Sequence, residues 1–364
     1  MNDVIERIIR IAARAPSAHN TQPWRVERVR DGIDLGLHDE RLLKAGDPTG
    51  RDALLGLGCW VEAAAIAARE AGVGLDIRSD DGLAAFSADP TTAPRSPLIR
   101  LRLAAGGEPA IDPAAVPDDS DQHVPFTSYD VQGRSVHRGR LAPIAGDAGM
   151  GAALGEPWLR LVRVPGKRAP RLVALGDAGT LGRRAVTEEA VDWIRFTPSD
   201  PRFDRDGLTG PTLMLPAAAA ALAGALTRSG AGRAVLENAL TLEARAAPVA
   251  AILNRSHPGL FVLVADGRRF GAHGVAGSAA HPTGLPADRM IAAGRAQMRA
   301  WLVAHRAGVA VAPASQVIDA PRAHAALRRG LGLRVADVAL AVFAAGVPSG
   351  TPPRSPRLPV HGST

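Results

Sequence analysis

A chain of 364 residues is long enough for one large or two ordinary domains, and its 46% hydrophobic residues can bury a substantial core. The single cysteine, Cys59, excludes a disulfide framework within the chain and a cysteine-based metal cluster, and it favours a reducing compartment. The net charge of +7 comes from scattered residues that are nearly all Arg, without a nucleic-acid-binding motif, so nucleic acid is not an expected partner.

The first 130 residues alternate amphipathic helices with short strands. Apolar residues recur at helical spacing over residues 3–14, with Asn2 as the N-cap. The elements expected after this helix are a loop at 15–23, strands at 24–30 and 32–38, a helix from about Asp52 to Ala71, and a strand at 97–105. Residues 106–130 are rich in Pro, Asp and Gly, which indicates a linker.

The sequence predicts neither a secretion signal nor a membrane span. Asp3 and Glu6 stand where a signal peptide would begin its apolar run, so we expect a cytoplasmic protein. The longest apolar stretch, residues 213–226, is interrupted by Pro216 and is shorter than the roughly 18 to 20 residues that cross a bilayer. We expect a buried or lid helix there, and no membrane partner.

Two segments of the first half recur in the second half. QPWRVERV around Trp24 returns as EPWLRLVRV around Trp158, and GLGCWVEAAAIAAREAGV around Gly58 returns as AAGRAQMRAWLVAHRAGV around Gly294. The offset grows from 134 to 236 residues, so an insertion of about a hundred residues is expected between about 185 and 285. Chance similarity between two Ala-rich helices is the alternative for the second pair.

The stretch ARAPSAHNTQPW, residues 13–24, places short polar side chains on a loop. The loop lies between a helix that ends at a proline and a strand anchored by Trp24. Ser17, Asn20 and Gln22 can hydrogen-bond a polar, planar ligand from this position. The alternative is that the Ser and Asn side chains cap their own loop.

The pattern A-x-x-A-P-S-x-x-N-x-Q-P-W resembles the signature of the nitroreductase superfamily. The resemblance implies that Ser17 and Asn20 contact the ribityl chain and ring of FMN, with Pro16 and Gln22 in the same binding loop. His19, next to these residues, is either a proton donor or, as we expect here, a surface histidine.

The segment GRSVHRGR, residues 133–140, is similar to the R-R-S/T-x-R phosphate-binding segment of the superfamily. Arg134 and Ser135 take the central places, and either His137 or Arg138 takes the last. Arg suits a phosphate because its planar guanidinium donates two charge-assisted hydrogen bonds, and a following helix N-terminus would complete the anion site. Gly133 stands where a first Arg is common, and a solvated basic loop is the alternative.

The C-terminal segment AGVPSGTPPRSPRLPV resembles the closing segment of the superfamily, in which an Arg reaches the FMN phosphate. The resemblance implies this role for Arg354 or Arg357. An extended arm that packs on the other half is the alternative.

Each half keeps the flavin-binding elements that the other half lacks. The resemblance therefore implies an α+β nitroreductase fold in which two pseudo-symmetric halves, residues 1–130 and 131–364, are fused and share one composite FMN site. DPTGRDALLGLG at 47–58 and EEAVDWIRFTPSDPRFDRDGL at 188–208 resemble segments of the Acg-like tandem group, which implies a lid at about 185–257. We expect a monomer, because the usual two-fold interface lies inside the chain.

The expected function is that of an FMN-dependent oxidoreductase. Its reactions would be reduction of nitroaromatics or quinones by NAD(P)H, or dehydrogenation of a small molecule. The cofactor carries the hydride chemistry, so no catalytic side chain is assigned. The alternatives are a flavin-binding or flavin-storage protein whose lid blocks the reductant, and an interaction scaffold without a cofactor.

Overall fold

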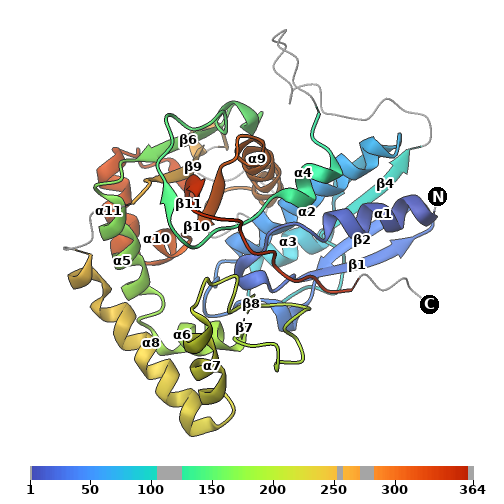
Figure 1. The fold of residues 1–364 in the computed structure, drawn as a ribbon. Helices are drawn as coiled ribbons and strands as arrows, with labels where there is room; N and C mark the ends of the chain where they lie inside the picture. Colours follow the sequence, from blue (N-terminus) through green and yellow to red (C-terminus); the bar gives the residue numbers. More distant parts are fainter. Residues whose placement is uncertain (1, 105–124, 252–256, 271–282, 360–364) are drawn as a thin grey trace.

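The computed structural model describes residues 2–104, 125–251, 257–270 and 283–359, which form two main antiparallel sheets and the helices around them (Figure 1). The first sheet has the order β1-β2-β4-β3, with β1 at Trp24–Val29, β2 at Gly32–Leu37, β3 at Gly74–Ser79 and β4 at Ile99–Ala104. The second has the order β6-β9-β11-β10, with β6 at Leu159–Val164, β9 at Leu260–Asp266, β10 at Ala310–Pro313 and β11 at Asp337–Pro348. The short strand β5 (Leu141–Ala142) pairs with the end of β11. This mixture of helices and sheets confirms the α+β class.

The two helices predicted in the first half are present as α1 and α2. The helices of the described residues are α1 (Asn2–Ala12), α2 (Arg51–Glu70), α3 (Asp81–Ala88), α4 (Ser128–Gly133), α5 (Ala169–Gly179), α6 (Arg184–Asp192), α7 (Ala217–Leu226), α8 (Gly230–Ala250), α9 (Ala287–Arg306), α10 (Gln316–Asp319) and α11 (Pro321–Leu331). Most of the expected linker lies outside the described residues. Its last residues instead begin α4, because Thr127 and Asp130 form a capping box there.

The two sheets have the same strand order once the strands are matched through the sequence repeats. Trp24 begins β1, Trp158 directly precedes β6, and both side chains are buried. Strand β3 follows α2 as β10 follows α9. The matched segments therefore occupy equivalent places in the two halves of the molecule.

Helices α2 and α9 cross at two glycines. A Cβ on Gly58 would lie 2.8 Å from the Cα of Gly294, and a Cβ on Gly294 would lie 2.9 Å from the Cα of Gly58. Each Cβ would also collide with a carbonyl of the opposite helix, that of Ile291 for Gly58 and that of Leu55 for Gly294. The contacts are reciprocal, as they are about a two-fold axis. Side chains from both helices and both sheets share one hydrophobic core.

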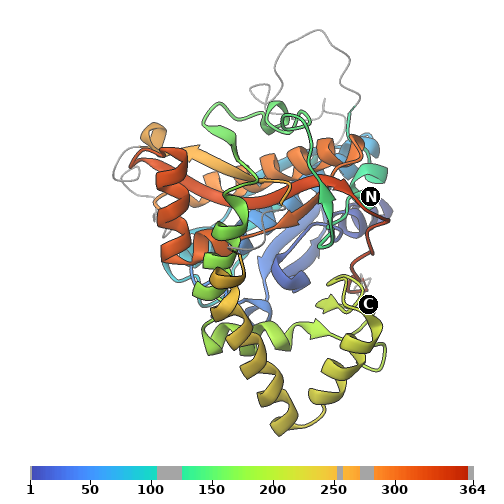
Figure 2. The ribbon, with the colours of Figure 1, turned by 60° about the vertical axis from the view of Figure 1, so that its left-hand side comes forward.

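The second half carries an insertion between β6 and β9, at residues 165–259. The range of about 185–285 expected from the repeats is therefore too late in the chain, because it contains the core strand β9. The insertion contains α5 to α8 and a short parallel pair, β7 (Ile194–Arg195) and β8 (Leu208–Thr209). Figure 2 shows that α7 and α8 form a hairpin that extends away from the sheets. The predicted lid range of 185–257 covers α6 to α8, although residues 252–256 lie outside the described residues. None of the described helices combines the length and apolar character needed to cross a membrane.

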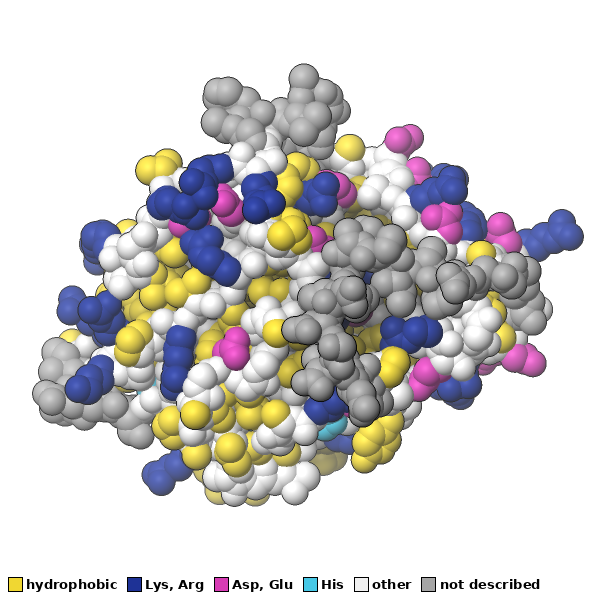
Figure 3. Space-filling model, turned by 90° about the horizontal axis from the view of Figure 1, so that it is seen from above, with side chains coloured by type: hydrophobic (Ala, Val, Ile, Leu, Met, Phe, Trp, Pro, Cys, Tyr) yellow, Lys and Arg dark blue, Asp and Glu magenta, His cyan; other side chains and the backbone are white. Residues whose placement is uncertain are grey.

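After β11, residues 349–359 run back as an arm to the first half, beside the end of α1 (Figure 1). Basic side chains do not gather in one place on the surface in Figure 3, where Lys and Arg lie in several separate groups. The dispersed charge agrees with the scattered Arg positions in the sequence.

Candidate functional site

A cavity of about 770 Å³ lies between the insertion and the rest of the molecule. Its walls come from the loop at 16–19 and α2 in the first half, and from α9, the region around α10 and the insertion in the second. The insertion contributes mostly apolar side chains, among them Leu213, Leu236 and Leu240. A space of this size, apolar with a few polar groups, is typical of small-molecule and cofactor sites.

The signature loop reaches the cavity through its first residues. Pro16, Ser17 and His19 line the cavity, and the Ser17 Oγ accepts a hydrogen bond from the backbone N–H of Gln22 at 3.0 Å. His19, Asn20 and Gln22 have φ values of 48°, 54° and 50°, in the left-handed region that non-glycine residues rarely adopt. Strained residues of this kind persist only where surrounding contacts hold them.

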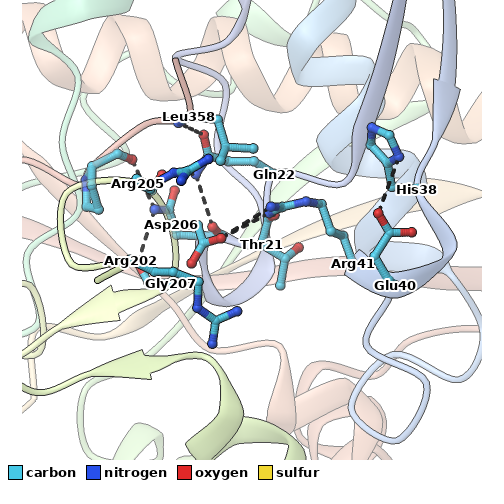
Figure 4. Close-up of polar contacts among 12 residues, drawn as sticks. Thr21, Gln22, His38, Glu40, Arg41, Arg202, Arg205, Asp206, Gly207 and Leu358 are labelled. Atoms are coloured by element: carbon cyan, nitrogen blue, oxygen red, sulfur yellow. Dashed lines mark hydrogen bonds and ion pairs between the residues drawn. The ribbon is translucent and has the colours of Figure 1, made fainter. Parts of the chain in front are cut away.

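Those contacts come from Asn20 and Gln22, whose side chains bind other parts of the chain. The Nδ2 of Asn20 donates to the carbonyls of Gly207 and Pro356, at 3.1 Å each. The Nε2 of Gln22 donates to the Arg205 carbonyl at 2.9 Å, and its Oε1 accepts from the Leu358 N–H at 2.9 Å. Figure 4 shows Gln22 between the loop at 205–207 and the C-terminal arm. Neither Asn20 nor Gln22 is among the residues that line the cavity.

Arg357 fastens the C-terminal arm to the end of α1. Its Nε donates to the Ala13 carbonyl at 2.8 Å, and its Nη2 donates to the Arg14 and Ala15 carbonyls at 3.0 and 3.2 Å. Its Nη1 donates to the Asn20 Oδ1 and to the carbonyl of Pro356, at 2.8 Å each. These contacts use all five N–H groups of the guanidinium. Three of the acceptor carbonyls lie in the turn that directly follows α1.

Arg14 and Arg134, beside this clamp, have buried N–H groups without a partner. The unpaired atoms are the Nε of Arg14 and the Nε and Nη1 of Arg134. Arg134 is 7% exposed, donates to the Arg14 carbonyl at 3.2 Å and lies over the ring of Trp301, which lines the cavity. Burial, followed by the charge of Arg354, lowers the pKa of Arg14 to about 10. Burial also lowers the pKa of Arg134 to about 10.

Four arginines thus form one cluster. The sequence predicted a phosphate-binding role for Arg134, Arg354 and Arg357, and the structure adds Arg14. In the described part of the chain, no carboxylate forms an ion pair with any of the four. Arg354 is exposed and donates to the Gln132 carbonyl at 2.7 Å. Buried cations without a counter-charge are costly, and an anion that accepts their free N–H groups would offset that cost.

The remaining residues of the basic segment lie in different surroundings. Arg138 lines the cavity, where the walls around it partly desolvate the guanidinium and lower its pKa. His137 is buried, its Nδ1 accepts from the Gly139 N–H at 3.1 Å, and its Nε2 has no partner. Ser135 is half-buried and does not line the cavity. The helix expected after this segment is absent from these described residues, since Arg134 follows α4 and the chain leads into β5.

The expectation of a surface histidine is wrong for His19, which belongs to the cavity wall. Burial, followed by the charge of Arg138, lowers its pKa to about 4. The ring is therefore neutral at neutral pH and can take part in hydrogen bonding, but it does not supply an imidazolium proton.

Sequence reasoning missed the acidic wall of the cavity. Asp47, Asp52, Asp177 and Asp319 line it, and Arg51 bridges Asp319 at 2.8 Å and Asp52 at 2.9 Å. Burial raises the pKa of Asp177 and of Asp319 to about 6. The sequence signal was DPTGRD, in which an Arg has carboxylates four residues before it and one residue after it.

Cys59 is buried on α2, and its Sγ donates to the Gly294 carbonyl at 3.2 Å. Burial raises the pKa of the thiol to about 12, so the group is uncharged and held in the helix crossing. No group of three or more potential metal-binding side chains occurs among the residues that the structure describes.

Comparison with known proteins links the chain to named nitroreductases. Over 70 residues it is 43% identical to a Mycobacterium tuberculosis H37Rv protein whose name is that of an NAD(P)H nitroreductase, Acg. The similarity to an Acg-type nitroreductase is confined to this segment. A second such protein of the same strain, Rv3131, is 36% identical over 56 residues.

These similarities are partial. The match to Acg covers 19% of this chain and 21% of Acg, and the match to Rv3131 covers 15% and 16%. The matched part of the chain therefore spans about a fifth of the length of Acg and about a sixth of the length of Rv3131. No family model matches the chain.

Proposed function

We propose that the protein is an FMN-dependent oxidoreductase that takes electrons from NAD(P)H, with one composite flavin site per chain. The relatives' names support an NAD(P)H-linked reduction. The reciprocal helix crossing and the matching strand orders support a fusion of two nitroreductase-like halves. The cavity, which residues of both halves line, supports a site to which both halves contribute.

The single observation that carries the flavin proposal is the set of unpaired guanidinium groups. FMN ends in a phosphate, and the free N–H groups of Arg14 and Arg134 are donors of the kind that phosphates bind. Arg354 adds a third charge next to them. Arg357, whose N–H groups are all used, would hold these residues in place rather than bind the phosphate itself. The residues present therefore fit a phosphate-bearing cofactor.

The cavity itself, which Arg14, Arg134 and Arg354 do not line and which Arg134 adjoins through Trp301, suits the ring system. The loop at 16–19 and Arg138 supply polar groups, and Trp301 and the leucines of the insertion supply apolar ones. Bound FMN would accept a hydride and pass it on, and the protein would bind, orient and shield it from water. The neutral His19 ring would contribute a hydrogen bond rather than a proton.

Anaerobic reduction tests the proposal directly. The protein loaded with FMN should lose its yellow flavin absorbance when mixed with NADH or NADPH, and should regain it when a quinone or nitroaromatic compound is added. Retention of the absorbance with both nicotinamides would argue against the reductase. A protein that is colourless as purified and takes up no added FMN would rule out any flavin function.

A flavin-binding or flavin-storage protein is the second candidate, favoured by the contacts that tie the insertion down. Asp206 of the insertion accepts from both Nη atoms of Arg41 in the first half, at 3.3 Å each (Figure 4). The signature loop adds the bonds from Asn20 and Gln22. A lid held by so many contacts would restrict the entry of a reductant.

A further inference from the structure

A groove of about 800 Å³ lies between α5 and α11, separate from the candidate flavin cavity. The two helices run side by side in both ribbon views (Figures 1 and 2). At one end the Nη1 of Arg168, just before α5, donates to the Gly330 carbonyl near the end of α11 at 2.8 Å. At the other end Gly179 packs against Ala320. The helices are thus antiparallel, and the groove follows their length.

The charged side chains that line the groove all have the same sign. They are Lys167, Arg168, Arg171, Arg322 and Arg329. No acidic residue lines it, and none of these five side chains forms an ion pair in the described structure. Other Arg residues of this basic protein do form such pairs, as Arg160 does with Asp337 at 2.8 Å and Arg102 does with Asp34 at 2.6 Å.

Three of these cations lie at the N-terminus of α5, which is the positive end of the helix dipole. Lys167 and Arg168 directly precede α5, and Arg171 lies in its first turn, which contains no acidic residue. A helix N-terminus disfavours positive charge because its free N–H groups point outward. Like charges gathered at this end repel one another and the helix dipole, so a bound anion would relieve both interactions.

The floor of the groove is apolar. Leu172 and Leu175 of α5 face Ala325, Ala326 and Leu331 of α11 across it. Leu175, Ala325, Ala326 and Leu331 are only partly buried, which leaves hydrocarbon surface open beside the cations. An anion without an apolar part would leave this surface in water.

We propose that this groove binds an amphiphilic organic phosphate, with the phosphate at Lys167, Arg171 and Arg329 and the hydrocarbon part along the leucine floor. Several cations at one end favour a phosphate, which carries more than one negative charge near neutral pH, over a carboxylate. The proposal is independent of the flavin function.

Calorimetric titration with four matched probes tests the ligand class. Dodecyl phosphate, below its micelle-forming concentration, should bind roughly ten-fold more tightly than inorganic phosphate, dodecanol or dodecanoate. Equal binding of inorganic phosphate would show that the floor is not used, and equal binding of dodecanoate would show that the second charge is not recognised. Either result, or no binding of dodecyl phosphate, overturns the proposal.

Two double variants locate the binding. Arg171→Gln with Arg329→Gln should weaken dodecyl phosphate by roughly ten-fold, since each change removes a charge-assisted contact. Arg10→Gln with Arg30→Gln removes the same charge from exposed positions elsewhere and should leave the affinity unchanged. An equal loss of affinity in this control would show that only the net charge of the protein matters, and it would overturn the proposed site.

A third variant separates the groove from the flavin cavity. Every titration is run with enough free FMN to keep the flavin site saturated, including in Arg134→Gln, which should not alter the affinity for dodecyl phosphate. If Arg134→Gln abolishes binding while the Arg171 and Arg329 changes do not, the probe occupies the flavin cavity and the proposal fails. Thermal unfolding of each variant shows whether it is folded, and the exposed positions of Arg171 and Arg329 predict that it is.

Discussion

The polar residues of the loop at 16–22 have two different roles. Ser17 and His19 line the cavity, whereas Asn20 and Gln22 hold the insertion and the C-terminal arm. Three left-handed residues in this loop store strain, each on the order of 1 kcal/mol. The buried hydrogen bonds of Asn20 and Gln22 offset that strain, so the same residues can shape the site without touching its ligand.

Replacing Arg134 tests the phosphate role at the level of one side chain. Arg134→Gln should weaken FMN binding by about ten-fold or more, because a charge-assisted hydrogen bond contributes roughly 1.5 to 3 kcal/mol. Riboflavin, which lacks the phosphate, should bind equally well to variant and parent. Fluorescence titration with both flavins gives the answer. If both flavins lose affinity together, Arg134 organises the loop rather than binding phosphate.

Asp177 predicts a pH-dependent change in stability. Burial, with a contribution from Glu243, raises its pKa from 3.8 to about 6, so the folded state favours the protonated acid. The stability from this group is complete below about pH 4 and is lost as the pH rises through 6, where the buried carboxylate opposes folding.

Asp177→Asn should therefore stabilise the protein at pH 8 by on the order of 1 kcal/mol and leave it nearly unchanged at pH 4. Urea unfolding at the two pH values measures the difference. Asp31→Asn, at an exposed position, is the matched control. A similar gain in the control would assign the effect to net charge rather than to burial.

At the scale of elements, the crossing of α2 and α9 depends on the absence of two side chains. Gly58→Ala should force the helices apart, because its Cβ would meet the Ile291 carbonyl and lie 2.8 Å from the Gly294 Cα. We expect a loss of about 1 to 3 kcal/mol in the free energy of unfolding. Gly230→Ala, at the start of α8 with open space around it, should have no such cost. Equal stability of the two variants would contradict the close crossing.

The contact between Arg41 and Asp206 ties the insertion to the first half. Arg41→Gln removes this ion pair and the bond to the Thr21 carbonyl at 2.7 Å, while Arg195 still pairs with Asp206. If the insertion controls access, the variant should speed the reduction of bound flavin by NADPH several-fold. Stopped-flow absorbance measures the rate. Arg184→Gln, which breaks an exposed pair within α6, serves as control and should not change it.

At the scale of the whole molecule, side chains of two equivalent sheets share one core, and the candidate phosphate donors come from both halves. Of the two arginines with unpaired N–H groups beside the arm, Arg14 belongs to the first half and Arg134 to the second. Such an arrangement should bind one FMN per chain. Absorbance of the released cofactor against protein concentration measures this ratio, and a ratio of two would mean that each half carries its own site.

The sequence by itself determined several elements of the first half and their repetition in the second. The spacing of apolar residues placed α1 and α2, and the matches around Trp24 and Gly58 located their counterparts around Trp158 and Gly294, because helical period and turn residues are local properties of the chain. The repeats also limited the insertion to the second half. Resemblance of short motifs selected Arg134, Arg354 and Arg357, which the structure brings together with Arg14.

Only the tertiary structure decided which polar atoms are left for a ligand. The partners of Asn20 are 187 and 336 residues away, and the Arg357 clamp joins positions 344 residues apart, so no local pattern could show that these groups are already used. The acidic wall formed by Asp177 and Asp319 and the unpaired groups of Arg14 likewise depend on how distant segments pack. A sequence determines which hydrogen-bonding groups are present, and packing determines which of them remain unsatisfied.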